Sequence, residues 1–186
     1  MQDLFLKYRQ QGATLMELMV VIAIMAILTV VAVPAYNSFV ANSQSQSIAT
    51  QLAASLRYAY TEAITRGYDI YFCPTVTANT VGCGTSNWRK GWQVVDSNTN
   101  AALEMVGTTG SGSTGSGSLI ISSTTISASP AITEIIMHNN GFNTAAPTSG
   151  TITFTIKPTG CSGSAGGRVV TWTPSGYVYI ASVSCP

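Results

Sequence analysis

Apolar residues run almost unbroken from Leu15 to Tyr36, behind a polar N-terminal segment that contains Lys7 and Arg9. About twenty apolar residues in a helix cross the ~30 Å hydrocarbon layer of a membrane, so this run predicts a transmembrane helix. Its basic end is expected on the cytoplasmic side. A conventional secretory signal peptide has only about 7–15 apolar residues before its cleavage site, and this run is too long for that class.

Beyond the apolar run, hydrophobic residues recur at helical spacing on one face only, which is typical of an amphipathic helix. Gly67 after Arg66 is a stop signal for this helix. Pro34 lacks an amide hydrogen and is expected to kink or open the helix before its second half. We expect this second half to be a stem packed on a head. The recurring residues are Ile48, Leu52, Leu56, Tyr60 and Ala63.

After Gly67 the period changes to two, which predicts short antiparallel strands, and glycines and prolines between them predict turns. The expected strands are 70–73, 92–95, 119–121, 135–137, 151–156, 168–172 and 177–183. One face of this sheet must cover the stem, because the sheet has nothing else to bury against. The Gly/Ser-rich residues 107–118 are expected to form a loop. The prediction is an α+β fold, a long N-terminal helix packed on an antiparallel β-sheet head.

Charged residues make up only 8% of the chain, against a typical quarter, so its surface must be largely neutral. The formal net charge is +1. Without a leader that contains Asp3, Lys7 and Arg9, six basic and six acidic side chains remain, from eight minus two and seven minus one. This balance gives no overall electrostatic attraction to nucleic acid and suits an extracellular protein.

The four cysteines all follow the apolar run, and none lies in a C-x-x-C pair. With His138 as the only histidine, a zinc site is poorly supported. Four cysteines allow three pairings, and Cys73–Cys83 with Cys161–Cys185 is favoured because each closes a short loop worth about 3 kcal/mol. Four unpaired thiols are the alternative. Disulfides would place the head in an oxidising compartment, the periplasm or the cell exterior.

Glu17 lies just inside the apolar run, where a carboxylate is costly and is usually kept for a partner. The residues around it, Gly12 followed by ATLMEL and later Pro34 and Tyr36, resemble the class III leader of type IV pilins. The resemblance implies cleavage between Gly12 and Ala13 by prepilin peptidase and methylation of the Ala13 amine. It also implies that Glu17 pairs with the amine of a neighbouring subunit during assembly, and that Pro34 is a weak point of the assembled helix.

A second resemblance covers the start of the head. The sequence EAITRG at 62–67, IYFCP at 70–74, Cys83 and WRKGWQVVD at 88–96 are similar to the GspH/FimT/FimU family of minor pilins and pseudopilins. The resemblance implies a type IV pilin fold with residues 1–12 as a cleaved leader, 13–36 as the transmembrane half of the helix, and 37–186 as the head. With the leader, it covers about the first hundred residues.

Four cations are candidate DNA contacts. Arg89 and Lys90 lie between Trp88 and Trp92, and aromatic rings beside cations can form a nucleic-acid platform. The alternative, a core tryptophan beside solvated cations at a strand edge, is favoured. Some FimT-like proteins bind DNA through a C-terminal Gly-Arg-x-Arg pattern, of which only Arg168 is present, because Val170 takes the second position. Lys157 completes the set if the fold brings it to the same face.

No catalytic residue, cofactor site, metal site or small-molecule substrate is predicted, since the sequence contains no nucleophile motif such as G-x-S-x-G. The predicted function is structural. A minor pilin would be anchored by a single helix in the inner membrane with its head in the periplasm, and would then join other minor and major pilins near the filament tip to prime assembly. A DNA-binding minor pilin and the pseudopilin H of a type II secretion system are the alternatives.

Overall fold

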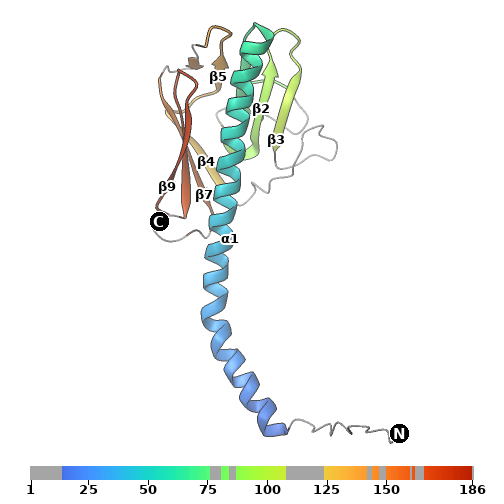
Figure 1. Ribbon diagram of the computed structural model, residues 1–186, viewed down its shortest axis with the longest axis vertical. Coiled ribbons are helices and arrows are strands. Elements are labelled where there is room, and N and C mark those ends of the chain that lie inside the picture. The colour runs from blue at the N-terminus through green and yellow to red at the C-terminus, as the bar shows by residue number, and fades with distance from the viewer. Residues whose placement is uncertain are drawn as a thin grey trace, which may run out of the picture. The chain divides into compact units, whose positions relative to one another are not determined.

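The computed structural model describes residues 14–75, 81–83, 87–107, 124–141, 144–146, 150–159, 161 and 166–185. The chain forms two compact units, Met1–Asn37 and Ser38–Pro186. Helix α1, Leu15–Arg66, belongs to both of them (Figure 1).

In the first unit, the large apolar side chains of α1 whose burial the structure describes are exposed, among them Leu15 at 78% and Ile27 at 70%. No single helix of the described residues is long and apolar enough to span a membrane. The pair Leu15–Val30 and Ala35–Arg66, joined through a bend, meets the requirements of length and composition together. The interval between the two segments includes Pro34, and a proline ring removes one amide donor from the helical ladder.

In the second unit, the stem buries one stripe of α1 and ends in a glycine cap. Gly67 has φ +76 and its amide donates to Ala63 O at 3.0 Å, the left-handed ending that glycine adopts without a Cβ clash. The expected stop at Gly67 is therefore confirmed. Tyr60, which the periodicity places in the stripe, is half-buried against the core. The buried apolar residues of the stripe are Ala41, Ile48, Ala49, Leu52, Ala53, Leu56, Ala59 and Ala63.

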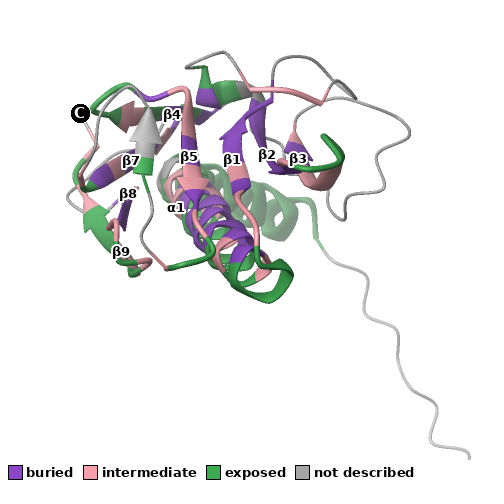
Figure 2. Ribbon diagram, turned by 90° about the horizontal axis from the view of Figure 1, so that it is seen from above, coloured by how far each residue is buried: buried purple, intermediate pink, exposed green. Residues whose placement is uncertain are grey.

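The strands of the described residues form two antiparallel sheets that share their core with the stem. The first sheet has the order β3-β2-β1-β5-β6 and the second β4-β7-β8-β9. Buried residues gather on α1 and on strands β1 and β2 (Figure 2). The strands are β1 Ile70–Pro74, β2 Gly91–Asp96, β3 Ala102–Gly107, β4 Thr124–Ser129, β5 Glu134–Met137, β6 Thr144–Ala146, β7 Ile152–Pro158, β8 Gly167–Trp172 and β9 Val178–Val183.

The α+β fold with a long helix against antiparallel strands is confirmed, but one sheet was expected and two are present. Six of the predicted strands coincide with β1, β2, β5, β7, β8 and β9. The seventh, at 119–121, lies outside the described residues. The sequence patterns missed β3, β4 and β6. Strand β4 is mostly threonine and serine, and β6 is only three residues long.

Trp88 contacts both sheets inside the shared core. It lies in the short 3-10 helix η1, Trp88–Lys90, directly before β2. Its ring stacks on Phe72 of β1 at 5.6 Å between centroids and meets Phe154 of β7 edge-on at 4.8 Å. Its Nε1 donates to Ile132 O at 3.3 Å, which satisfies the indole donor inside the core.

Two disulfides cross-link the head. They join Cys73 to Cys83 and Cys161 to Cys185, with Cα–Cα distances of 5.5 and 5.8 Å. They are the two pairs that the sequence favours. The first joins β1 to the segment before η1. The second ties Cys185, two residues after β9, to the segment after β7, with β8 and β9 inside its loop.

We predict that Cys185→Ser destabilises the protein more than Cys83→Ser. The two loops span sequence separations of 24 and 10 residues, which the chain-entropy relation converts to about 3.4 and about 2.7 kcal/mol. Both serines replace half-buried cysteines, so the two variants are matched in burial. Thermal or denaturant unfolding of the purified chain measures the difference. The prediction would be contradicted if both variants unfolded at the same temperature or denaturant concentration as the oxidised wild type. Four reactive thiols in the native protein would also contradict it.

Candidate functional site

The predicted processing residues Gly12 and Ala13 lie outside the described residues, which begin at Thr14. Thr14 Oγ1 accepts a hydrogen bond from Glu17 N at 3.3 Å, and its carbonyl accepts from Leu18 N at 3.2 Å. Thr14 is thus an N-cap for α1. Glu17 lies in the first helical turn, where the helix dipole favours a negative charge.

The surroundings of Glu17 are apolar. It is exposed, and the large side chains of the same segment, including Met16 at 76% and Leu18 at 60%, are exposed with it. A carboxylate that is removed from water among apolar side chains is costly unless an opposite charge pairs with it. This arrangement suits pairing with a cationic group of a neighbouring chain.

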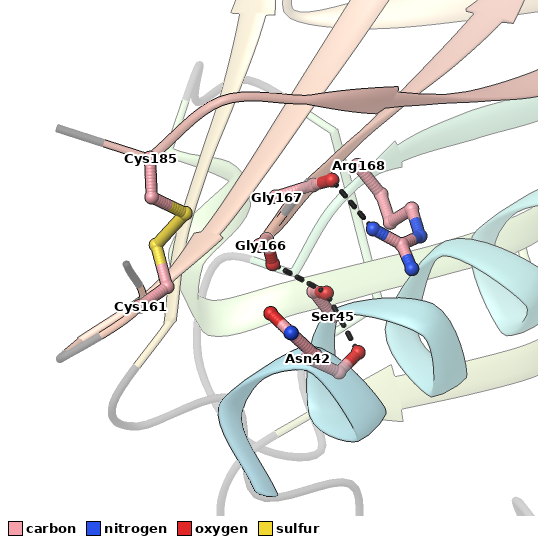
Figure 3. The surroundings of a disulfide bond; sticks show 7 residues. All are labelled: Asn42, Ser45, Cys161, Gly166, Gly167, Arg168 and Cys185. Atoms are coloured by element: carbon pink, nitrogen blue, oxygen red, sulfur yellow. Dashed lines mark hydrogen bonds between the residues drawn. A yellow bond between two sulfur atoms is a disulfide. The ribbon is translucent and has the colours of Figure 1, made fainter. Parts of the chain in front are cut away.

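Arg168, the candidate DNA contact at the start of β8, is engaged with the stem. Its Nε donates to Gln46 Oε1 at 2.6 Å, and its Nη1 donates to Gly167 O at 2.8 Å. Beside it, Ser45 Oγ lies 2.9 Å from Gly166 O and 2.9 Å from Asn42 O (Figure 3). We call these contacts the stem clamp. The pattern of the sequence did not indicate it, because its partners are more than one hundred residues apart.

Lys157 and Arg168 lie on opposite faces of the second sheet. Arg168 is the cross-strand partner of Ile156, so it shares the face of this buried residue. Successive residues of a strand point to opposite faces, which puts Lys157 on the outer face. The condition that these two cations share one face is therefore not met.

Arg89 and Lys90 do not form an aromatic platform with their neighbours. Trp88 and Trp92 are 1% and 0% exposed, so both rings belong to the core and neither offers a face to a base. Arg89 is exposed in η1. The side chain of Lys90 lies outside the described part of the chain. The interpretation of core aromatics beside a solvated cation fits the burial of the two tryptophans and the exposure of Arg89.

Asp96 at the end of β2 binds side chains at the C-terminal end of the stem. Tyr68 donates its hydroxyl to Asp96 Oδ2 at 2.7 Å, and Arg66 Nη1 lies 3.3 Å from the same oxygen. Asp96 Oδ1 accepts from the amides of Asn98 and Thr99. The Tyr68 hydroxyl, followed by these amides, holds the pKa of Asp96 below its usual value. The cluster fixes the helix end to the β2–β3 turn.

Three further polar contacts, at two places in the head, were not indicated by the sequence. Ser55 on the stem donates to Glu104 Oε1 on β3 at 3.0 Å, and burial raises the pKa of Glu104. His138 follows β5 and joins Asp69 Oδ1 at 2.9 Å to Thr144 Oγ1 at 3.2 Å through its two ring nitrogens. This places His138 as a link between β1, β5 and β6 at the strand ends.

Among the described residues, no group of three or more His, Cys, Asp or Glu side chains is placed to hold a metal ion. The Gly/Ser-rich segment 107–118 lies outside these residues except for Gly107. The head therefore presents structural contacts between stem and strands, and α1 presents the apolar surface that carries Glu17.

Two family models match the chain. The model of the type II transport protein GspH matches residues 49–176, and the model of the prokaryotic N-terminal methylation motif matches residues 7–33. No curated protein matches.

The comparison with solved structures finds two of the type IV minor pilin FimU from Pseudomonas aeruginosa. The crystal form in space group P21 has 22% sequence identity and a TM-score of 0.53, covering 77% of this chain and 92% of that chain. The form in space group P65 has 23% identity and a TM-score of 0.46, covering 73% and 91%. The GspH model spans more than half of the sequence. The chain therefore belongs to the GspH family, as a type IV pilin-like protein with a prepilin methylation motif.

Proposed function

We propose that this protein is a minor pilin that enters a type IV pilus at or near the filament tip and primes its assembly. The proposal rests on one combination of features. A methylation motif at 7–33 precedes a head with the pilin fold, and the carboxylate of Glu17 lies in the first turn of an exposed apolar helix. Such a helix requires other apolar chains or lipid around it, and its carboxylate requires a cation.

Before assembly, residues 13–36 anchor the chain in the inner membrane, with the leader 1–12 in the cytoplasm and the head 37–186 in the periplasm. The basic leader supports this orientation, and two disulfides in the head support an oxidising compartment. After cleavage and methylation at Ala13, the subunit leaves the membrane for the surface pilus.

The partners follow from this role. Prepilin peptidase cuts the chain between Gly12 and Ala13, and Glu17 then binds the new amine of a neighbouring minor or major pilin. Pro34 provides a place where the helix adjusts to its neighbours. The family is one of structural subunits, and we propose no catalytic activity, cofactor or small-molecule substrate for this member.

A role as pseudopilin H in type II secretion is the second candidate, because the matching family model is that of the type II transport protein GspH. Deletion of the gene distinguishes the two roles. Loss of surface pili and twitching motility with normal secretion supports the pilus role. Loss of secreted exoenzymes with normal pili supports the pseudopilin.

DNA capture is less favoured. Lys157 and Arg168 lie on opposite faces, and Arg168 is engaged in the stem clamp. The mature chain has six basic and six acidic side chains by the sequence count, so it provides no long-range steering toward DNA.

We predict that Gly12→Val leaves an uncut precursor in the inner membrane, because a side chain at this position obstructs the approach of the peptidase to the backbone. Mass spectrometry of the membrane fraction measures the N-terminus. Gln10→Val is the control and is expected to be processed normally. A wild-type N-terminus other than methylated Ala13 would refute the cleavage site.

Glu17→Ala is expected to be processed but to assemble at least tenfold less, because a neighbouring ammonium loses its counter-charge in an apolar setting, a loss of about 3–5 kcal/mol when such a pair is broken. Glu17→Gln is expected to fail in the same way, since it keeps the shape and removes the charge. Thr29→Ala is the control, because the Thr29 hydroxyl donates to Ala26 O of its own helix. The ratio of subunit in sheared pili to subunit in membranes is the measurement, and normal incorporation of Glu17→Gln would contradict the pairing.

The head, residues 37–186, is expected to bind duplex DNA weakly or not at all at physiological salt. Even four phosphate contacts, from Arg89, Lys90, Lys157 and Arg168, imply a log-log salt slope of only about −3.6, and the fold divides two of them between opposite faces. A gel shift with micromolar affinity, abolished by Arg168→Ala, would make DNA capture the leading function.

A further inference from the structure

Strand β3 is an edge of the first sheet and is held less firmly than the strands inside it. Among the described strands it pairs with β2 alone, and the register of this pair shifts between Val94 and Val95, directly beside Glu104. Within β3, Val106 is buried and Leu103 is half-buried against the core. An edge strand that is interrupted by a register shift opens locally at a lower free energy than a central strand.

Glu104 joins this strand to the stem through one of its two carboxyl oxygens. Its Oε1 accepts a hydrogen bond from Ser55 Oγ at 3.0 Å, and Ser55 is only 1% exposed. The other oxygen, Oε2, is also buried and has no hydrogen-bond partner among the described residues. Val94, the cross-strand partner of Glu104, is buried and apolar. We call the contact between Ser55 and Glu104 the β3 latch.

Among the described side chains, the charges near the β3 latch are engaged elsewhere. The charged residues of the stem and of β2 are Arg57, Glu62, Arg66 and Asp96. Arg57 donates to Val178 O on β9, and Arg66 is paired with Glu62 and Asp96. Tyr58 of the stem also interacts with Glu104, because burial, followed by the charges of Glu62 and Glu104, raises the pKa of Tyr58. Within this part of the chain, Glu104 therefore has a neutral donor and no cation.

A carboxyl group in such a place is more stable as the neutral acid, because burial penalises the charged form. Burial raises the pKa of Glu104, and the hydrogen bond from Ser55 offsets this effect only in part. The closed latch therefore binds a proton more tightly than a glutamate in water, whose pKa is about 4.3. The stabilisation by the proton is complete below this ordinary value and is lost as the pH rises through the raised pKa.

We propose that Glu104 makes the β3 latch pH-dependent, so that β3 is closed on the stem when the carboxyl group is protonated and opens when it is ionised. Opening beside the register shift hydrates the carboxylate. Because β3 is an edge strand, it opens without disturbing the pairing of β2 with β1. The inference goes beyond the proposed function and concerns the head alone. In the proposed location outside the cytoplasm, the pH of the surroundings then sets the order of this strand.

The test measures hydrogen exchange by mass spectrometry on the full, oxidised chain in detergent micelles, between about pH 4 and about pH 8. Protection factors, corrected for the intrinsic effect of pH on exchange, are compared for β3 and for β1 at the centre of the same sheet. In wild type, protection of β3 relative to β1 is expected to fall at least about fivefold from low to high pH, or about 1 kcal/mol. Glu104→Gln is expected to remove this fall and to exceed wild-type protection at high pH.

A second variant keeps the proposal testable if Glu104→Gln fails to fold. Ser55→Ala removes the donor and keeps the carboxyl group, so β3 is expected to be protected as in wild type at low pH and less than in wild type at high pH. Glu134→Gln is the matched control, because Glu134 is a half-buried carboxylate on β5 of the same sheet. It is expected to keep the wild-type pH dependence. Other groups titrate in all variants alike and cancel in the comparison.

An unchanged pH dependence of β3 in Glu104→Gln would overturn the proposal. So would an equal fall of protection in β1 and β3 of wild type, which would indicate a global loss of stability. Wild-type protection of Ser55→Ala at every pH would also overturn it, as would a loss of the pH dependence in Glu134→Gln, which would indicate a general effect of charge. These outcomes leave the proposed function untouched, because it is tested separately by the Gly12 and Glu17 variants.

Discussion

The stem and the two sheets share one core, and Trp88 lies in this core in contact with both sheets. Its ring touches Phe72 of the first sheet and Phe154 of the second, while the buried stripe of the stem belongs to the same cluster. A sheet of four or five short strands needs a second layer to bury its apolar face. At the two ends of the stem, Ser45 with Gly166 and Arg66 with Asp96 then determine which part of the helix meets the strands.

Helix α1 has to satisfy two environments, and its composition changes between them. In the first unit the described apolar side chains of α1 are exposed, and each large one left in water costs about 1.5–3 kcal/mol. In the second unit the apolar residues form a stripe in which alanines alternate with Ile48, Leu52 and Leu56. The small residues allow the strands to approach the helix closely. The first half therefore depends on lipid or neighbouring chains, whereas the second is complete within its own head.

The features that could be predicted from the sequence are those with a strong local pattern. Three of them belong to a single helix and its end. They are the apolar run, the stripe of the stem and the stop at Gly67. Strand β4 was missed because Ile126 is its single large apolar residue among threonines and serines. The division into two sheets depends on which strands pair, and alternation reveals the faces of a strand but not its partners. The contact of Arg168 with Gln46 spans 122 residues, so no local pattern indicated it.

The covalent loop from Cys161 to Cys185 also affects how subunits behave when crowded together. Strand β9 is an edge of its sheet, and an edge strand held only by hydrogen bonds can detach and pair with another copy. Arg57 of the stem covers one of its carbonyls, at Val178 O, and the disulfide ties its end to the segment that follows β7. Strand exchange between heads would require this bond to open first. The covalent bond thus keeps β9 attached to its own sheet for as long as the bond is intact.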